Sequence, residues 1–261
     1  MALTGDGKRV SFLAGNEGGT DRTVVLRDQP IAVEGFVVGW PLAMTEDARV
    51  IAYQLIDAQS GKASIAVDGR RGELFDAVGT PVLSDDGKVV AHRAQLGESH
   101  FVVIGDRRER AFDFVKDPAL SADGTWAAYA GARGGQWFLV VDGNERAVEH
   151  EPADVFVGPD RRCVGWTYLE PAANGGSTAR VVVGERRSEP FDLVGRPVFS
   201  ADGSKVAWFA ERADRSYIVA GDRMIEIRGR PSNPVWSRDG RQLGFGVRLD
   251  RELWWNVVDC P

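Results

Sequence analysis

The residues best suited to chemistry are few in this sequence, and their positions do not bring them together. It contains three histidines, His92, His100 and His150. Imidazole nitrogen is a common zinc ligand, but a metal site needs several ligands within about 2.0–2.2 Å of one ion. His92 is expected inside a second strand, His100 at the start of a third strand and His150 near an outer strand, so they should not converge. The sequence therefore predicts no metal site.

Carboxylate pairs are the other candidates for chemistry. Asp85-Asp86 and Glu149/Glu151 could act as general acid and base only if one carboxyl were desolvated, and carboxylates in turns are usually hydrated. The sequence has no Gly-x-Ser-x-Gly nucleophile motif and no glycine-rich phosphate loop. Its Asp-Gly turns lack the alternating oxygen ligands and the closing Glu of a calcium loop. We therefore predict no catalytic residue and no cofactor, and we expect that the chain is not an enzyme.

An internal repeat sets the elements that would have to position any site. A short apolar strand, an Asp-Gly turn and a second strand recur along the chain, most clearly in Pro197–Trp208. Asp-Gly between two apolar runs favours a tight hairpin, because glycine accepts a positive φ. The repeat has a period of about 39 residues and occurs seven times. Its aligned aspartates are Asp6, Asp47, Asp86, Asp123, Asp160, Asp202 and Asp239.

Each turn is followed by a second strand in which a small residue precedes a large ring, as in Ala128-Tyr129 and Ala207-Trp208. This pattern suits sheets packed face to face, because the ring fills the space beside its small neighbour. A third strand follows a variable loop, and a fourth strand leads into the next repeat. Four short antiparallel strands in a unit of about 40 residues predict an all-β, seven-bladed β-propeller of four-stranded antiparallel blades.

The string Pro-x-aromatic-Ser-x-Asp-Gly-x-x-Val-Ala-aromatic resembles the WD40-like (PD40-type) repeats of the TolB propeller family, and it covers essentially the whole chain. The repeats differ from true WD40 repeats, since no blade closes with Trp-Asp. Ala48 and Arg161 stand where the turn glycine is expected, so these two turns can differ in type. The resemblance implies a propeller used for binding partners or ligands and, in relatives, for catalysis. Three repeats also share the signature Phe-Asp-x-Val-x-x-Pro, in Phe75–Pro81, Phe112–Pro118 and Phe191–Pro197.

We predict one propeller domain over residues 1–261. Its last blade ends after a third strand, residues 252–259, so this blade should be three-stranded or be completed by residues outside this chain. An uncovered third strand would expose Trp254 and Trp255 on an edge that can dock another chain; a covered edge is the alternative. The approximate blades are 1–38, 39–79, 80–116, 117–152, 153–195, 196–231 and 232–261.

Loops held by a rigid scaffold are frequent binding sites. We predict a non-enzymatic interaction module that presents its loops to a protein partner, at the channel mouth or at the edge of the last blade. The alternative is a sensor of a small ligand or glycan, with Trp40 as a stacking platform and Asp117, Arg196 and Asn233 as polar contacts. An ordinary solvated funnel would contain the same residues. The residues expected around the channel mouth are Trp40, Thr80, Asp117, Asp154, Arg196 and Asn233.

The composition limits the classes of partner that we expect. The formal net charge is −6, and nucleic-acid binding needs clustered Lys and Arg, so we expect no nucleic-acid partner and assign the run 107–110 to a solvated turn. No apolar run is long enough to cross a membrane. Cys163 and Cys260 fall in different blades, so they are expected to be free thiols, which favours a reducing compartment. TolB-like propellers are commonly exported, so the compartment stays open between cytoplasm and periplasm.

Overall fold

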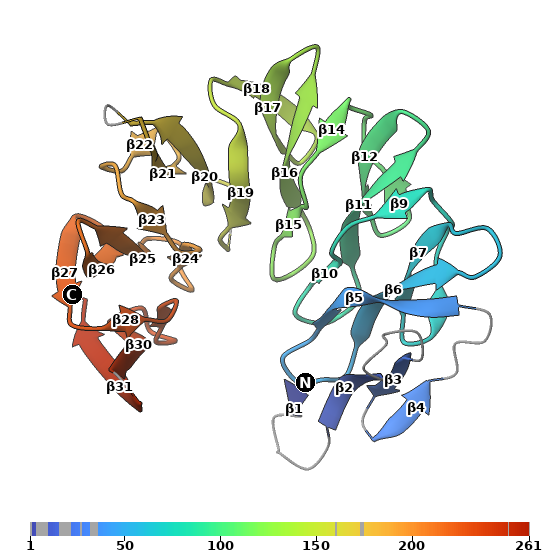
Figure 1. Ribbon diagram of the computed structural model, residues 1–261, viewed down its shortest axis with the longest axis horizontal. Coiled ribbons are helices and arrows are strands. Elements are labelled where there is room, and N and C mark those ends of the chain that lie inside the picture. Colours follow the sequence, from blue (N-terminus) through green and yellow to red (C-terminus); the bar gives the residue numbers. More distant parts are fainter. Residues whose placement is uncertain are drawn as a thin grey trace. The chain divides into compact units, whose positions relative to one another are not determined.

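Antiparallel β-strands make up the regular structure of the chain (Figure 1). A computed structural model describes residues 2–3, 10–15, 22–26, 28–31, 36–159, 161–172, 175–249 and 251–260. Within residues 1–41, it describes the side chains of Phe12, Thr23, Val25 and residues 28–30 alone. The described residues contain no helix and form seven antiparallel sheets. The chain divides into two compact units, Met1–Glu145 and Arg146–Pro261.

The first four sheets follow the chain from its start, and each runs in sequence order from its first strand to its outer strand. Sheet one contains β1 (Ala2–Leu3), β2 (Val10–Gly15), β3 (Arg22–Leu26) and β4 (Gln29–Ile31). Sheet two contains β5 (Phe36–Met44), β6 (Ile51–Asp57), β7 (Ala63–Val67) and β8 (Arg70–Arg71). Sheet three contains β9 (Ala77–Val78), β10 (Val82–Leu83), β11 (Val90–Leu96), β12 (Ser99–Ile104) and β13 (Arg107–Arg108). Sheet four contains β14 (Phe114–Val115), β15 (Ala119–Leu120), β16 (Ala127–Arg133), β17 (Gln136–Val141) and β18 (Asn144–Val148).

The remaining three sheets follow the same order, and the last is three strands wide within the described residues because β28 and β29 both pair with β30. Sheet five contains β19 (Pro152–Val157), β20 (Val164–Pro171), β21 (Ser177–Val183) and β22 (Arg186–Arg187). Sheet six contains β23 (Leu193–Val194), β24 (Val198–Phe199), β25 (Val206–Arg212), β26 (Arg215–Ala220) and β27 (Arg223–Ile227). Sheet seven contains β28 (Arg230–Pro231), β29 (Val235–Trp236), β30 (Gln242–Leu249) and β31 (Glu252–Asp259).

The first strand of a repeat is split into two pieces in sheets three, four, six and seven. Proline directly precedes the second piece in each case, at Pro81, Pro118, Pro197 and Pro234. Because proline has no N–H to donate, the ladder pauses there and resumes one residue later. In these four sheets, proline therefore marks the start of the second piece of a divided strand.

The Ser-x-Asp-Gly turns are tight hairpins with one repeated hydrogen-bond pattern. In the third repeat, Ser84 Oγ donates to Asp86 Oδ1 at 2.8 Å, Lys88 N donates to the same oxygen at 3.0 Å, and Gly87 has φ of 70°. Ala48 keeps the same turn with φ of 52°, so the missing glycine does not change its type. The turns at Asp6 and Asp160 lie outside the described residues. The five described turns pair Thr45 with Asp47, Ser84 with Asp86, Ser121 with Asp123, Ser200 with Asp202 and Ser237 with Asp239.

These turns should make the fold sensitive to acid. Hydrogen bonds from Lys88 lower the pKa of Asp86 from 3.8 to about 2, and those from Ser200 and Ser204 lower the pKa of Asp202 to about 2. A lowered folded-state pKa gives stability that is present above pH 4 and is lost as the pH falls toward 2. Urea unfolding between pH 7 and pH 2 should show this loss, and Asp86→Asn should reduce its size. An unchanged loss in that variant would contradict the assignment.

The small-large pattern of the second strands builds the core. Tyr53, Tyr129, Trp208 and Phe245 are buried, each directly after a buried or half-buried small residue. His92 occupies the same position and packs edge-on against Phe75, with ring centroids 6.0 Å apart. It is therefore a packing residue. In the second unit, the rings fill the interfaces between sheets five and six and between sheets six and seven.

The Phe-Asp signature joins consecutive sheets. Phe112 exchanges two backbone hydrogen bonds with His100, at 2.8 and 3.0 Å. The next residue, Asp113, accepts a hydrogen bond from Gly134 N at 2.7 Å and so fixes the hairpin between β16 and β17. Phe therefore binds the preceding sheet while Asp binds the following one. The equivalent pairs are Asp76 with Gly97 and Asp192 with Ala213.

Candidate functional site

In the first unit, two of the predicted channel-mouth residues, Thr80 and Asp117, lie near the hydrogen bond between Arg93 and Asp117. Asp117 is half-buried and accepts a hydrogen bond from Arg93 Nε at 2.8 Å. A Cβ added at Gly79, the neighbour of Thr80, would lie 2.2 Å from Asp117 Oδ1. Thr80 and Asp117 therefore lie in adjoining segments of sheets three and four. Trp40 belongs to β5, but its side chain lies outside the described residues.

In the second unit, three predicted residues follow one another across sheets five, six and seven. Arg196 Nε lies 4.0 Å from Asp154 Oδ2, and both side chains are exposed. Asn233 Oδ1 would lie 2.6 Å from a Cβ built at Gly195. The structure thus brings Asp154, Arg196 and Asn233 into one row. A long contact between exposed charges contributes little to stability, and none of the three lines either of the cavities described below.

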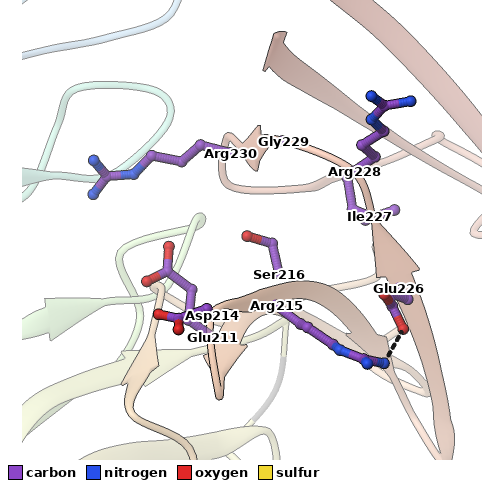
Figure 2. Close-up of a pocket in the computed structure, with 9 residues that line it drawn as sticks. All are labelled: Glu211, Asp214, Arg215, Ser216, Glu226, Ile227, Arg228, Gly229 and Arg230. Atoms are coloured by element: carbon purple, nitrogen blue, oxygen red, sulfur yellow. Dashed lines mark hydrogen bonds and ion pairs between the residues drawn. The ribbon is translucent and has the colours of Figure 1, made fainter. Parts of the chain in front are cut away.

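A polar groove opens at the loop end of sheets six and seven (Figure 2). Its volume is about 840 Å³. One wall is the hairpin between β25 and β26, which turns through Ala213 and Asp214, both at positive φ. The other wall is the segment that leads from β27 to β28. The lining residues are Glu211, Asp214, Arg215, Ser216, Glu226, Ile227, Arg228, Gly229 and Arg230. We call this the charged groove.

Most charges in the charged groove have no counter-ion. Arg215 Nη1 and Glu226 Oε2 form an exposed ion pair at 3.2 Å. Within the described residues, no ion pair involves Arg228, Arg230, Glu211 or Asp214. In Figure 2, Arg230 extends over the same side of the groove as the Asp214 and Glu211 carboxylates. The groove therefore offers donors and acceptors of both charges to a ligand.

The sequence does not single out the charged groove. Its turn at 213–214 is among the shortest between a second and a third strand, and the loops that vary most in sequence lie elsewhere. Arg230 belongs to sheet seven and Arg228 to the connection that leads to it, whereas Asp214 lies in a hairpin of sheet six. Only the packing of the two sheets brings these charges together. In the sequence, the one indication of these charged residues is that they lie in or beside loops, and loops were predicted to bind the partner.

A second cavity of about 970 Å³ lies beside the interface of sheets five and six. Its lining includes Phe191, Trp208 and Arg212, and the Arg212 guanidinium lies 4.4 Å above the Phe191 ring. Trp208 Nε1 and Arg212 Nη2 are buried without a hydrogen-bond partner among the described residues. Unpaired buried donors are costly, so these two atoms are places where a hydrogen-bond acceptor would be stabilised.

The remaining candidates for chemistry stay separate. Among the described residues, no group of three or more His, Cys, Asp or Glu side chains is placed to hold a metal ion. Cys163 and Cys260 are both buried, and neither is joined in a disulfide. His150 stacks on Tyr168 with ring centroids 4.4 Å apart, which is a packing contact. No helix suited to cross a membrane occurs in the described part of the chain.

The predicted docking edge of the last sheet is exposed. Trp254 and Trp255 are 55% and 64% exposed, respectively. Their strand, β31, pairs with β30 and with no other strand among the described residues. The structure therefore places both tryptophans on a free strand edge, which we call the β31 edge.

Solved structures include chains that are similar to this one in fold. The β-propeller domain of the Trilobed protease from Pyrococcus furiosus is 14% identical over 87% of this chain and 83% of that chain, with a TM-score of 0.52. Puromycin hydrolase is 14% identical over 99% of this chain and 51% of that chain, with a TM-score of 0.51. TolB from Acinetobacter baumannii is 13% identical over 86% and 77%, with a TM-score of 0.42.

No family model matches the chain, and no curated protein sequence matches it. At these low identities, the structural likeness bears on the fold alone. The number of blades and the single closed domain stay predictions of the sequence. The antiparallel sheets and the likeness to solved propellers together confirm the architecture that the repeat predicted: the chain has a β-propeller fold.

Proposed function

We propose that this chain is a non-enzymatic interaction module that binds a charged segment of a protein partner in the charged groove. The observation that carries the proposal is the set of charges in that groove that have no ion pair among the described residues. Arg230 extends over Glu211 and Asp214, and Arg228 lies farther along the same wall. Complementary charges across an interface steer association and fix the register of the partner. A partner segment that carries both signs would satisfy both walls.

The lining favours a peptide segment over a small molecule. Small-molecule sites are mostly apolar with a few placed polar groups, whereas Ile227 is the one large apolar residue of this groove. The groove lies between loops carried by two packed sheets, and such loops are common binding surfaces. The alternative from the sequence, a small-ligand or glycan sensor at the channel mouth, stays a prediction.

Labelled peptides test the proposal. Fluorescence anisotropy would compare decapeptides of alternating Lys and Glu with decapeptides of Lys, Glu or Ser alone. We expect the mixed-charge peptide to bind most tightly and to weaken as salt increases, because exposed charges are screened. Arg230→Glu should weaken the binding of this peptide about tenfold, which is about 1.4 kcal/mol, because like charges across an interface repel.

Arg186→Glu provides the matched control. Arg186 is an exposed arginine on β22, outside the charged groove, so its reversal changes the net charge equally without touching the site. Equal weakening by both variants would show that binding follows net charge alone. That result, or equally tight binding of the Ser peptide, would contradict the proposed function.

A further inference from the structure

The β31 edge presents a regular set of unpaired backbone groups. Cys260 N donates to Arg241 O at 2.7 Å, so the even-numbered residues of β31 direct their N–H and C=O groups toward β30. Antiparallel strands alternate these directions residue by residue. The N–H and C=O groups of the odd-numbered residues therefore point away from β30. The carbonyl oxygen of Asp259 confirms this direction, because it accepts a hydrogen bond from Arg223 at 2.9 Å. The free positions before it are Leu253, Trp255 and Val257.

The side chains of these outward positions share one exposed face. Leu253, Trp255 and Val257 are 81%, 64% and 53% exposed. The opposite face carries Val258, which packs into the core between sheets six and seven. Trp255 lies across its own sheet, with a ring atom 2.5 Å from a Cβ built at Gly244. Natural edge strands are usually protected by lysine, proline or a bulge, and β31 has none of these.

We propose that the β31 edge pairs in antiparallel fashion with the same edge of a second copy of this chain. The two-fold axis passes through the pair of Trp255 residues. Leu253 then lies opposite Val257 of the second copy, and Arg251 lies opposite Asp259 of the second copy. Leu253, Trp255 and Val257 are the odd-numbered positions inside β31 whose N–H and C=O groups point toward their counterparts. Arg251 and Asp259 meet at the two ends through their side chains.

Charge and side-chain type select this register. Arg251 and Asp259 lie four positions on either side of Trp255, so a two-fold axis at Trp255 pairs opposite charges at both ends. Moving the axis by one residue to Trp254 would instead place Arg251 opposite Val257. Opposite charges facing each other stabilise a strand pair, and aromatic pairs add to it. An isologous contact also closes on itself and leaves no further free edge.

Cross-linking tests the register directly. In a hydrogen-bonded antiparallel pair the two Cα atoms are about 5.5 Å apart, which a disulfide can span. Trp255→Cys should therefore give a covalent dimer on mild oxidation. In Leu253→Cys, the two cysteines would be about 13 Å apart along the paired strands and should not cross-link. The native chain, whose cysteines are buried, is the background control. Cross-linking at position 253 but not 255 would overturn the register.

Light scattering coupled to gel filtration tests the dimer itself. The native chain should have twice the mass of one 28.4 kDa chain. Trp255→Lys places two ammonium groups on the axis and should raise the dimer dissociation constant at least tenfold, in line with loss of a buried aromatic anchor. Leu169→Lys is the matched control, because Leu169 is an exposed leucine on β20, and it should leave the mass unchanged.

A charge swap completes the test. Arg251→Asp alone should weaken the dimer about fivefold, and the double variant Arg251→Asp/Asp259→Arg should restore its affinity to within about twofold. A native chain that remains a monomer at 100 μM (roughly the range of a weak dimer) would overturn the proposal. So would a dimer that survives Trp255→Lys. The charged groove contains none of the substituted residues. Peptide binding in that groove should therefore be unchanged in every one of these variants.

Discussion

Replacing Phe112 with alanine is expected to lower the free energy of unfolding by about 3–5 kcal/mol. Phe112 is 3% exposed and lies edge-on to Tyr129, with ring centroids 6.2 Å apart. The guanidinium of Arg133 lies 4.9 Å from the centre of the ring. Truncation would remove the packing of the ring and leave a cavity in the core between sheets three and four, since the backbone bonds to His100 hold the segment in place.

Phe114→Ala is the matched control for this prediction. Phe114 lies two residues along the same segment but is 38% exposed, so its loss should cost about 1 kcal/mol, the value of an exposed aromatic pair. Urea unfolding followed by circular dichroism would compare the two variants at pH 7. Equal losses in both variants would show that Phe112 does not anchor this interface.

Much of the scaffold follows from short-range chemistry that the sequence displays. A tight turn needs a residue that tolerates positive φ and a side chain that binds its amides, and Ser84-x-Asp86-Gly87 supplies both. The register of the second strands follows from alternation, which puts His92 at the position that large rings hold in other repeats. Ala48 shows the limit of this reasoning, because hydrogen bonds around Thr45 hold a residue at φ of 52° that its own preference disfavours.

The candidate sites depend on distances that short-range chemistry does not set. The charges of Arg230 and Asp214 come from different sheets, so their opposition arises from how these sheets pack. The predicted channel-mouth residues were placed by counting back from the inner strands, and their position at a channel mouth stays a prediction. Counting back did not show which of them would line a cavity. The sequence left open whether Trp254 and Trp255 would be covered or exposed, and the structure shows both side chains exposed.

Gly87→Ala should lower the free energy of unfolding by about 2–5 kcal/mol. A methyl group at φ of 70° is strained by about 1–2 kcal/mol, and here it would also lie 2.4 Å from Val50 Cγ2. Overpacking of this kind typically costs a further 1–3 kcal/mol, roughly. The contact also connects consecutive repeats, because Val50 belongs to the turn before β6 and Gly87 to the turn before β11.

Gly97→Ala separates the cost of backbone strain from the cost of overpacking. Gly97 also has positive φ, 57°, but a Cβ there would meet no atom within 4 Å. It should therefore show the backbone strain alone, about 1–2 kcal/mol, and the difference between the two variants measures how tightly adjacent turns pack. If Gly87→Ala costs no more than Gly97→Ala, Val50 yields to the new methyl, and the turns of neighbouring repeats stabilise the fold independently of one another. If it costs more, each turn supports the next, and damage to one repeat should weaken its neighbour.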